Sequence, residues 1–361
     1  MHDGGPVSGI STYVYRLFKN LMLHNQNVTL YQYFIFEPEI NPPVGTVVLN
    51  KPKPMPHSNI KRKILYALNL TLGSNWHHFK KIESDLTILS NPSLLDLTKY
   101  IKNCGVIAHD LYYLYKNSDP KFLNFYYKGK YKLFDNAKFI ISNSNFTKMD
   151  LISKLNIDPK KITTVYPYID KSLFFPGDSN FKYNYKLNNK IKIILSVASE
   201  QPNKNIETVI KLMTKLPENY ILVRVGKNNS TLKLIKDLNL EKRVILKENI
   251  TETELADIYR GSDMLVFPSL FEGFGIPVIE AMATGTPVIV SNRGSLPEIV
   301  GNSGIISDPF DIDFMAEKIQ NILEDDRETR KYKELSLKRA ELFTMENQYN
   351  QMMKILNFLD F

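Results

Sequence analysis

Short apolar runs alternate with segments of helical periodicity along almost the whole of this chain. This alternation constrains the fold more than any other feature of the sequence. Strands that alternate with helices build parallel sheets from β-α-β units. We therefore predict an α/β fold.

The pattern occurs twice, once in each half of the chain. The first half is expected to contain strands at Val28–Tyr33, Leu86–Leu89, Val106–Ala108, Phe139–Ser142 and Thr163–Tyr166, and helices at Ile10–Leu23, Ile60–Leu70, Pro120–Leu133 and Phe146–Leu155. The second half is expected to contain strands at Ile193–Val197, Tyr220–Val225, Val244–Leu246, Met264–Phe267 and Val288–Ser291, and helices at Ile206–Leu216, Leu232–Leu238, Glu252–Arg260 and Pro277–Met282. A length of 361 residues suits two domains of ordinary size. The two sets predict two Rossmann-like, doubly wound domains.

The join between the domains is expected where the pattern breaks. Phe175-Pro-Gly-Asp178 interrupts it, and the stretch to Lys190 is polar and aperiodic. We predict an N-terminal domain over residues 1–175 and a C-terminal domain over residues 176–345. Residues 346–361 are expected to form a C-terminal helix that packs back toward the N-terminal domain.

The N-terminal domain lacks an expected element. A doubly wound domain opens with a strand, but here a glycine-rich turn at residues 3–9 leads directly into the helix from Ile10. A sheet without that strand would leave backbone groups unpaired. We therefore expect the first strand to be missing and the native chain to begin upstream.

Charge is distributed unevenly along the chain. Residues 1–170 hold 21 Lys/Arg and 12 Asp/Glu, whereas the remaining residues hold 25 and 26. Basic clusters are Lys51, Lys53, Lys61, Arg62 and Lys63, and Lys128, Lys130 and Lys132. A basic half suggests an anionic partner, such as a membrane surface or a lipid-phosphate acceptor. The alternative is an ordinary solvated surface. Nucleic acid is not expected, because the basic residues form no recognised motif.

The cellular location is inferred from what the sequence lacks. Cys104 is the single cysteine, so no disulfide can form within the chain. No window approaches the roughly 18 apolar residues of a membrane span, and no signal peptide is visible. We expect a cytoplasmic protein in peripheral contact with the anionic inner face of a membrane.

The richest segment runs from Met264 to Glu298. A strand ends at residue 267, a glycine-containing turn follows, and a helix begins near Pro277, which suits a first turn, with Gly285 at its C-terminal end. The free N–H groups and dipole at the start of this helix predict an anion site.

Two glutamates belong to that segment. Glu272 lies in the turn at the carboxyl end of the strand, where open α/β sheets bind ligands, and Glu280 lies about one turn into the helix. A diphosphate would repel carboxylates, so both are better placed on the hydroxyls of flanking sugars. The alternative is that Glu272 caps the helix and Glu280 is solvated.

The stretch Glu272-Gly-Phe-Gly-Ile-Pro-Val-Ile-Glu280 resembles the E-x7-E motif of family 4 glycosyltransferases. Val266–Ser269, Ala281–Val288, Gly294–Glu298 and Gly304–Asp311 resemble the family in the same way. The resemblance implies the GT-B fold, in which two Rossmann-like domains face a cleft, and transfer of a sugar with retention of configuration. It implies that Glu280 binds the donor ribose and that Glu272 holds a hexose hydroxyl. Donor contacts are also implied for Gly273 and for the backbone N–H groups of Phe274 and Gly275.

Further positions follow from the same resemblance. Ser196–Asn205 resembles the diphosphate loop, with Lys204 at the lysine position but Ser199 and Asn203 at positions that are often basic. Gly9 resembles a glycine of the first domain's loop, which would let the backbone approach the diphosphate or the acceptor. The resemblance implies donor contacts for both Gly9 and Ser199. His109 resembles the histidine that touches the donor sugar. The resemblance thus assigns catalytic roles to Glu272, His109 and Lys204.

Two neighbouring segments of the first half are also similar to the family. Asn143–Thr147 resembles a serine-containing turn, in which Ser144 would cap a helix. Tyr166–Asp170 resembles an interdomain segment, with Tyr168 in place of a glycine.

No metal or cofactor is expected. Asp311-Ile-Asp313 spells the D-x-D metal motif of other glycosyltransferases, but its position favours helix capping. The chain has no Cys/His cluster for zinc.

The resemblance predicts a retaining hexosyltransferase that uses a nucleotide-diphosphate sugar. Ser291–Glu298 resembles mannosyltransferase-like members of the family, which favours GDP-mannose as the donor. The expected acceptor is a glycan or lipid-linked molecule of cell-envelope or polysaccharide biosynthesis. Two alternatives stay open: another enzyme on this fold, such as an epimerase or phosphorylase, and a non-catalytic protein that binds a sugar nucleotide.

Overall fold

The computed structural model describes residues 9–24, 30–32, 46–48, 86–90, 92–101, 103–115, 127–226 and 231–359. The chain divides into two compact units. The C-terminal unit comprises Tyr166–Asn350 together with Met1–Gly9 and Ser144–Phe146. The N-terminal unit comprises Ile10–Asn143, Thr147–Val165 and Gln351–Phe361.

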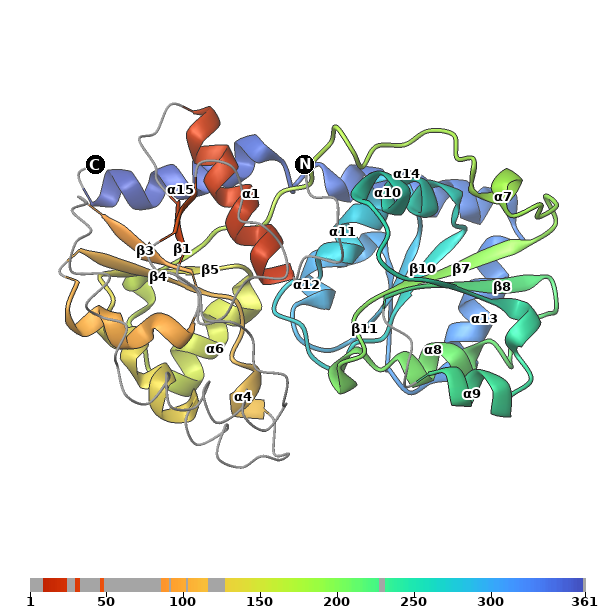
Figure 1. Ribbon diagram of the computed structural model, residues 1–361, viewed down its shortest axis with the longest axis horizontal. Coiled ribbons are helices and arrows are strands. Elements are labelled where there is room, and N and C mark those ends of the chain that lie inside the picture. Colours follow the sequence, from red (N-terminus) through yellow and green to blue (C-terminus); the bar gives the residue numbers. More distant parts are fainter. Residues whose placement is uncertain are drawn as a thin grey trace. The chain divides into compact units, whose positions relative to one another are not determined.

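Helices and strands alternate in both units, as the sequence predicts (Figure 1). The strands are β1 (Leu30–Gln32), β2 (Thr46–Val48), β3 (Thr87–Leu89), β4 (Cys104–Ala108), β5 (Phe139–Ser142), β6 (Ile162–Thr164), β7 (Lys192–Val197), β8 (Tyr220–Val225), β9 (Val244–Lys247), β10 (Met264–Phe267), β11 (Val288–Ser291) and β12 (Ile305–Ser307). The α-helices are α1 (Gly9–Leu23), α4 (Tyr112–Tyr115), α6 (Asn145–Leu155), α7 (Phe181–Asn184), α8 (Ile206–Leu212), α9 (Leu232–Asp237), α10 (Glu252–Gly261), α11 (Ile276–Ala283), α12 (Leu296–Val300), α13 (Ile312–Leu323), α14 (Asp326–Ala340) and α15 (Met345–Phe358). The 3-10 helices are η1 (Pro92–Lys99), η2 (Lys132–Asn136), η3 (Pro159–Lys161), η4 (Pro202–Lys204), η5 (Glu241–Arg243) and η6 (Gly301–Ser303).

The C-terminal unit contains a six-stranded parallel sheet in the order β12-β11-β10-β7-β8-β9. Figure 1 shows α8, α9 and α13 on one face and α10, α11 and α14 on the other. The strand order reverses between β7 and β10, so the carboxyl ends of these two strands border the crevice where doubly wound sheets bind ligands.

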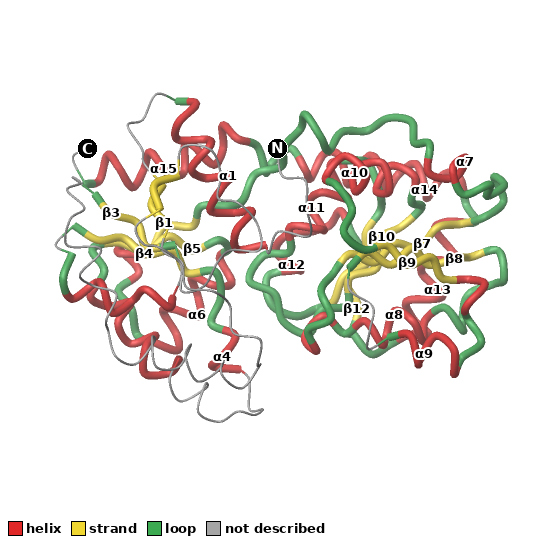
Figure 2. Tube along the Cα trace, in the orientation of Figure 1, coloured by secondary structure: helices red, strands yellow, loops and turns green. Residues whose placement is uncertain are grey.

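The core of this unit lies on both faces of the sheet, and the strands run between the helices (Figure 2). Successive residues of β7 point to opposite faces: Ile193 and Leu195 join the cluster under α10 and α11, whereas Ile194 joins the cluster under α8 and α13. All three are fully buried. This double burial explains why the strands are almost continuously apolar.

The N-terminal unit contains a four-stranded parallel sheet in the order β3-β4-β5-β6 and a separate parallel pair, β1 and β2. Strand β4 is buried throughout. Gly105 is required there because a Cβ atom would come within 2.1 Å of the Phe139 ring on β5.

The expected elements differ from the observed ones mainly at their ends. The helix expected at Ile206–Leu216 ends at Leu212, because the next N–H groups bond to carbonyls three residues back and the last turn tightens. The helix expected at Pro120–Leu133 is described from residue 127 and passes into η2 at Lys132. The helix expected at Ile60–Leu70 and the turn at residues 3–8 lie outside the described residues.

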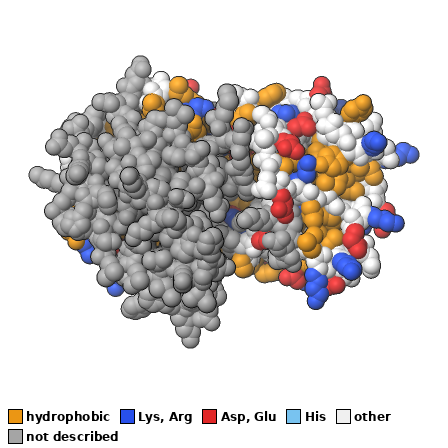
Figure 3. Space-filling view, viewed as in Figure 1, with side chains coloured by type: hydrophobic (Ala, Val, Ile, Leu, Met, Phe, Trp, Pro, Cys, Tyr) orange, Lys and Arg blue, Asp and Glu red, His pale blue; other side chains and the backbone are white. Residues whose placement is uncertain are grey.

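Charged side chains of the C-terminal unit are mixed rather than segregated. On the face shown in Figure 3, acidic and basic side chains are interspersed among hydrophobic ones. In the N-terminal unit, Lys130 is buried and forms an ion pair with Asp96 at 2.9 Å. Of the basic cluster expected at residues 128–132, Lys128 and Lys132 are exposed and Lys130 is buried. The cluster at residues 51–63 lies outside the described residues.

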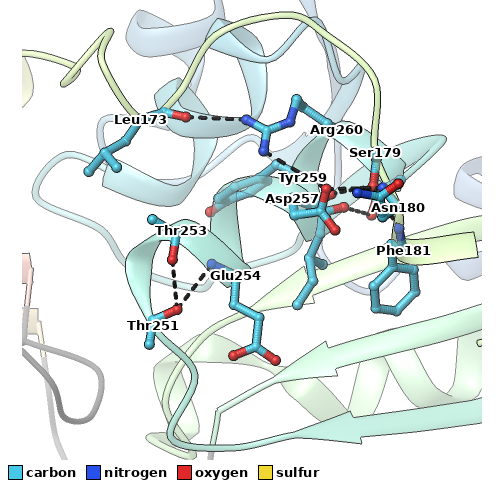
Figure 4. A network of polar contacts seen from close by, with 12 residues as sticks. Leu173, Ser179, Asn180, Phe181, Thr251, Thr253, Glu254, Asp257, Tyr259 and Arg260 are labelled. Atoms are coloured by element: carbon cyan, nitrogen blue, oxygen red, sulfur yellow. Dashed lines mark hydrogen bonds and ion pairs between the residues drawn. The ribbon is translucent and has the colours of Figure 1, made fainter. Parts of the chain in front are cut away.

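The segment around residues 173–181 was expected to be an aperiodic join, and it is held against α10 (Figure 4). Arg260 donates to the carbonyl of Leu173 at 3.3 Å, and the Ser179 hydroxyl donates to the carbonyl of Asp257 at 2.8 Å. Thr251 starts α10 by accepting the N–H of Glu254. These contacts fasten the segment to the C-terminal unit.

Two expectations at the C-terminal end of the chain are confirmed. Asp311 caps α13 by accepting the N–H of Phe314 at 3.0 Å, as expected, and Asp313 forms an ion pair with Lys215. The tail is helical, as α15. Within the described part of the chain, no helix has the length and apolar character that crossing a bilayer requires.

Candidate functional site

The best-defined polar site lies at the carboxyl ends of β7 and β10. Strand β10 is fully buried and ends at Phe267, and a turn over residues 268–275 leads into α11. Gly275 has a φ of +103°, and a Cβ atom there would approach a methyl carbon of Leu296 at 2.8 Å. Glycine is therefore required to enter this helix.

The turn presents unused backbone donors. Among the described residues, the N–H groups of Gly273, Phe274 and Gly275 have no hydrogen-bond acceptor. Helix α11 begins directly after them, with Pro277 in its first turn as expected. Free N–H groups and the positive end of a helix dipole together attract an anion.

Glu272 and Lys204 meet at this point. The Lys204 ammonium lies 2.5 Å from Oε1 of Glu272, and the two side chains are 19% and 11% exposed. Lys204 comes from η4, after β7, and Glu272 from the turn after β10. The structure thus brings together two of the three expected catalytic residues, which are 68 positions apart in the sequence.

Glu280 occupies a separate position on α11. Its side chain is buried, and Oε2 accepts a hydrogen bond from the Tyr259 hydroxyl at 3.3 Å. Tyr259 itself is fully buried on α10. The alternative of a solvated Glu280 is therefore wrong, because a buried carboxylate is retained only with specific partners.

The C-terminal end of α11 also follows the expectation from Gly285. Its φ is +78°, its N–H donates to Met282, and the N–H of Thr286 donates to Ala281. These paired bonds satisfy the last carbonyls of the helix.

A second segment holds the turn in place. Ser295 donates to the carbonyl of Glu272 through its N–H at 3.1 Å and to that of Phe274 through its hydroxyl at 2.9 Å. Gly294, with a φ of +62°, lies so close that a Cβ atom would come within 2.6 Å of the Glu272 carbonyl oxygen. The sequence resemblance included Gly294–Glu298 but assigned it no function. The structure shows that its first two residues support the turn that carries Glu272.

Asn203 has a structural role. Its amide donates to the carbonyl of Phe271 at 3.1 Å, and its backbone carbonyl accepts the N–H of Leu270 at 2.7 Å. It thus ties η4 to the turn that carries Glu272. Ser199, at a position that is often basic in the family, is exposed in the loop after β7 and carries no charge. Lys204 supplies the positive charge beside Glu272.

Asn205 adds a third tie to the same region. It adopts a left-handed backbone conformation, with a φ of +52°. Its amide donates to the carbonyls of Pro268 and Pro309 at 3.2 and 3.0 Å. The loop after β7 is therefore bonded to the segments that follow β10 and β12. Sequence reasoning assigned no role to Asn205.

Glu298 also has a role that the sequence did not reveal. Its carboxylate accepts the N–H groups of Asn145 and Phe146, the first residues of α6, at 2.8 and 2.9 Å, and the hydroxyl of Tyr166 at 2.5 Å. Burial, and then the neighbouring Glu298, raise the pKa of Tyr166. Glu298 thus accepts the first N–H groups of α6. The cap expected from Ser144 stays a prediction.

His109 and Gly9 lie elsewhere in the chain. His109 is buried after β4 in the N-terminal unit, where Nε2 bonds to the carbonyl of Ser90 at 2.7 Å and the ring packs edge-on against Tyr13. Burial lowers the pKa of His109 to about 4, so the ring is neutral at pH 7. Gly9 is the first residue of α1. The donor contacts expected for both stay predictions.

No site for a metal ion is evident among the residues that the structure describes: no three His, Cys, Asp or Glu side chains gather there in a way that could hold one. The expectation of metal-independent chemistry stays a prediction. The same applies to the expectation that no cofactor is used.

Two family models together match nearly the whole chain. The model of glycosyl transferases group 1 matches residues 178–339, and that of Glycosyltransferase Family 4 matches residues 7–173. The chain belongs to the group 1 glycosyltransferases. The family expected from residues 272–280 is thereby confirmed.

Two curated proteins similar to this group 1 glycosyltransferase are named as sugar transferases. The D-inositol 3-phosphate glycosyltransferase of Mycolicibacterium smegmatis is 29% identical over 226 residues, which are 60% of this chain and 52% of that protein. The O-antigen chain mannosyltransferase RfbU of Salmonella typhimurium is 31% identical over 229 residues, 62% of this chain and 61% of that protein. The chain matches about half the length of the first of these relatives.

Solved structures establish the fold. Sucrose-phosphate synthase from Thermosynechococcus elongatus superposes with a TM-score of 0.81 at 22% identity, covering 98% of this chain and 94% of the other. WaaG, a glycosyltransferase involved in lipopolysaccharide biosynthesis, gives 0.75 at 17% identity, with 96% of each chain covered. HepE of Anabaena in complex with UDP-glucose gives 0.74 at 16% identity, covering 98% and 97%. This group 1 glycosyltransferase therefore has the GT-B fold expected from its sequence.

Proposed function

We propose that this protein is a retaining hexosyltransferase that moves a sugar from a nucleotide-diphosphate donor to a glycan or lipid-linked acceptor of the cell envelope. The observation that carries the proposal is the arrangement at the start of α11. A lysine, a carboxylate and three backbone N–H groups without acceptors among the described residues meet at one turn. The lysine and the N–H donors suit a diphosphate, and the carboxylate suits a sugar hydroxyl.

The reaction breaks the bond between the anomeric carbon and the departing phosphate oxygen, and forms a bond from that carbon to the acceptor oxygen. Lys204 and the N–H groups of Phe274 and Gly275 stabilise the charge that develops on the diphosphate. Glu272 holds a hexose hydroxyl and Glu280 the ribose. The acceptor enters on the face from which the diphosphate leaves, and its proton passes to the departing phosphate oxygen. The configuration is thereby retained.

The donor is proposed from the relatives' names. RfbU is named a mannosyltransferase, which supports GDP-mannose as the first donor to test. The solved structure of HepE holds UDP-glucose, which supports a uridine donor as the alternative. The cell-envelope acceptor is supported by RfbU and WaaG, whose names mention O-antigen and lipopolysaccharide.

Peripheral contact with an anionic membrane on the cytoplasmic side belongs to the same proposal. It is supported by the excess of Lys and Arg in residues 1–170. Such contact would bring the enzyme to a lipid-linked acceptor.

A screen of thermal stability and donor hydrolysis tests the function, with GDP-mannose, UDP-glucose and UDP-N-acetylglucosamine as probes. We expect one donor to raise the melting temperature and to be hydrolysed slowly. Glu280→Gln should lose most of that shift, whereas Glu254→Gln, on the same unit but outside the site, should keep it. Stabilisation without transfer to any envelope acceptor would favour the non-catalytic alternative, and no response to any donor would contradict the proposal.

A further inference from the structure

Lys204 and Glu272 form an ion pair at the turn before α11. Among the described residues, neither the Lys204 ammonium nor the Glu272 carboxylate has another polar partner. The Lys204 ammonium also lies over the Phe267 ring, 5.9 Å from the ring centroid. The charge of Lys204 is therefore already neutralised before a ligand arrives.

The pair cannot separate by a simple shift of the turn. The carbonyl of Glu272 accepts two hydrogen bonds from Ser295, and Asn203, next to Lys204, is bonded to Phe271. Both charged side chains thus start from segments bonded to each other. A ligand that takes Lys204 must leave the Glu272 carboxylate beside it, in a site where the side chain is only 11% exposed.

The consequence differs between two ligands, if the proposed function holds. A nucleoside diphosphate competes with Glu272 for Lys204 and places phosphate charge next to an uncompensated carboxylate. An intact donor also carries a hexose, whose hydroxyls donate to that carboxylate and offset the loss of Lys204. The Glu272 carboxylate thus weakens binding of the nucleoside diphosphate, which is the product, more than binding of the sugar nucleotide, which is the substrate.

We propose that Glu272 determines the preference of this site for the intact sugar nucleotide over the nucleoside diphosphate, through its ion pair with Lys204. When the hexose has been transferred, the carboxylate loses its hydroxyl partners and returns to Lys204. The pair thereby speeds release of the diphosphate and limits product inhibition.

The test compares the dissociation constants of UDP, GDP, UDP-glucose and GDP-mannose for wild-type protein, Glu272→Gln and Lys204→Met, measured by calorimetry. Glutamine keeps the size of the side chain and its ability to bind hydroxyls but removes the charge. We expect Glu272→Gln to bind the free diphosphate roughly tenfold more tightly and the sugar nucleotide more weakly. Lys204→Met should lower the affinity for both the free diphosphates and the sugar nucleotides.

Glu254→Gln is the matched control, because Glu254 also pairs with a lysine, Lys247, at 3.2 Å, but away from the turn. It should leave all four constants unchanged. Tighter binding cannot arise from a damaged fold, so a gain in diphosphate affinity in Glu272→Gln supports the proposal. The product-inhibition constant should fall in the same variant.

Failure has two distinguishable forms. Equal or weaker binding of UDP and GDP by Glu272→Gln, with wild type binding a donor normally, would overturn this inference and leave the proposed function standing. Absence of binding of all four probes to wild-type protein would overturn the proposed function and this inference with it.

Discussion

Tyr259 shows how a single hydroxyl group supports the site. Its ring is fully buried between α10 and the core, in edge contact with Phe174, and its hydroxyl reaches Glu280 at 3.3 Å. The carboxylate of Glu280 is buried too, so its orientation depends on such bonds. Tyr259 is therefore a positioning residue for Glu280, the residue proposed to bind the donor ribose.

Replacement of Tyr259 by phenylalanine removes this hydrogen bond and keeps the ring. We expect the KM for the donor to rise by roughly three- to tenfold, since a hydrogen bond to a charged group is worth about 1.5–3 kcal/mol and water replaces part of it. The kcat should change little. Steady-state kinetics with the donor from the screen measures both constants, and an unchanged KM would show that Glu280 is held without Tyr259.

His109 links burial to acid stability. Its pKa is about 4 in the folded protein and near 6.5 in the unfolded chain, because burial disfavours the charged ring. Between pH 4 and pH 6.5, the unfolded chain therefore binds more protons at His109 than the folded protein does. The contribution to stability is fully present above pH 6.5 and is lost as the pH falls toward 4.

The acid sensitivity can be measured by urea unfolding at pH 7 and at pH 4.5. Wild type should lose about 2–3 kcal/mol of unfolding free energy through this residue over that range. His109→Gln keeps a donor for the Ser90 carbonyl but does not titrate, so its pH dependence should be flatter by that amount. Identical slopes in the two proteins would show that His109 does not carry the effect.

At the scale of elements, the turn before α11 depends on the close approach of Gly294. A side chain at this position would meet the backbone of Glu272, and its φ of +62° is unfavourable for other residues. The turn, η4 and the start of α12 thus form one bonded assembly around the pair of Lys204 and Glu272.

Gly294→Ala should lower the unfolding free energy by roughly 1–3 kcal/mol and weaken donor binding, since the turn must shift. Gly129→Ala is the control, because Gly129 is exposed in a helical stretch and nothing lies within 4 Å of a Cβ atom there. That change should be neutral or slightly stabilising. Chemical unfolding together with calorimetry gives both quantities. If Gly294→Ala binds the donor as tightly as wild type does, donor binding does not depend on the geometry of this turn.

What the sequence predicts correctly is local. The strand, glycine turn and helix around Glu272 and Glu280 follow from apolar runs, Pro277 and Gly285, which act on neighbouring residues. Contacts such as Ser295 with Phe274, Asn203 with Phe271 and Glu298 with Asn145 join residues 21, 68 and 153 positions apart. No periodicity encodes them, because they arise only when the strands have taken their order in the sheet.

At the scale of the whole molecule, the uneven charge gives a testable property. Exposed Lys128 and Lys132 belong to the basic half, whereas exposed Lys171 and Lys186 belong to the balanced half. In vesicle sedimentation, we expect wild type to bind anionic vesicles at low salt and to dissociate at high salt. The Lys128→Gln/Lys132→Gln variant should bind roughly five- to thirtyfold more weakly, at about 1 kcal/mol per lysine.

The variant Lys171→Gln/Lys186→Gln removes the same charge from the other half and should bind nearly as wild type does. Neutral vesicles should bind none of the three proteins. If binding depends neither on salt concentration nor on vesicle charge, the proposed electrostatic contact with an anionic membrane loses its support.

The chain passes from one compact unit to the other several times, and its last segment, Gln351–Phe361, belongs to the N-terminal unit. Helix α15 therefore starts in one unit and ends in the other. A gene fusion that exchanged whole halves at one junction would give a chimaera whose final helix comes from the wrong parent. Recombination of this protein with a relative, in the laboratory or in evolution, has to transfer residues 351–361 together with the first half.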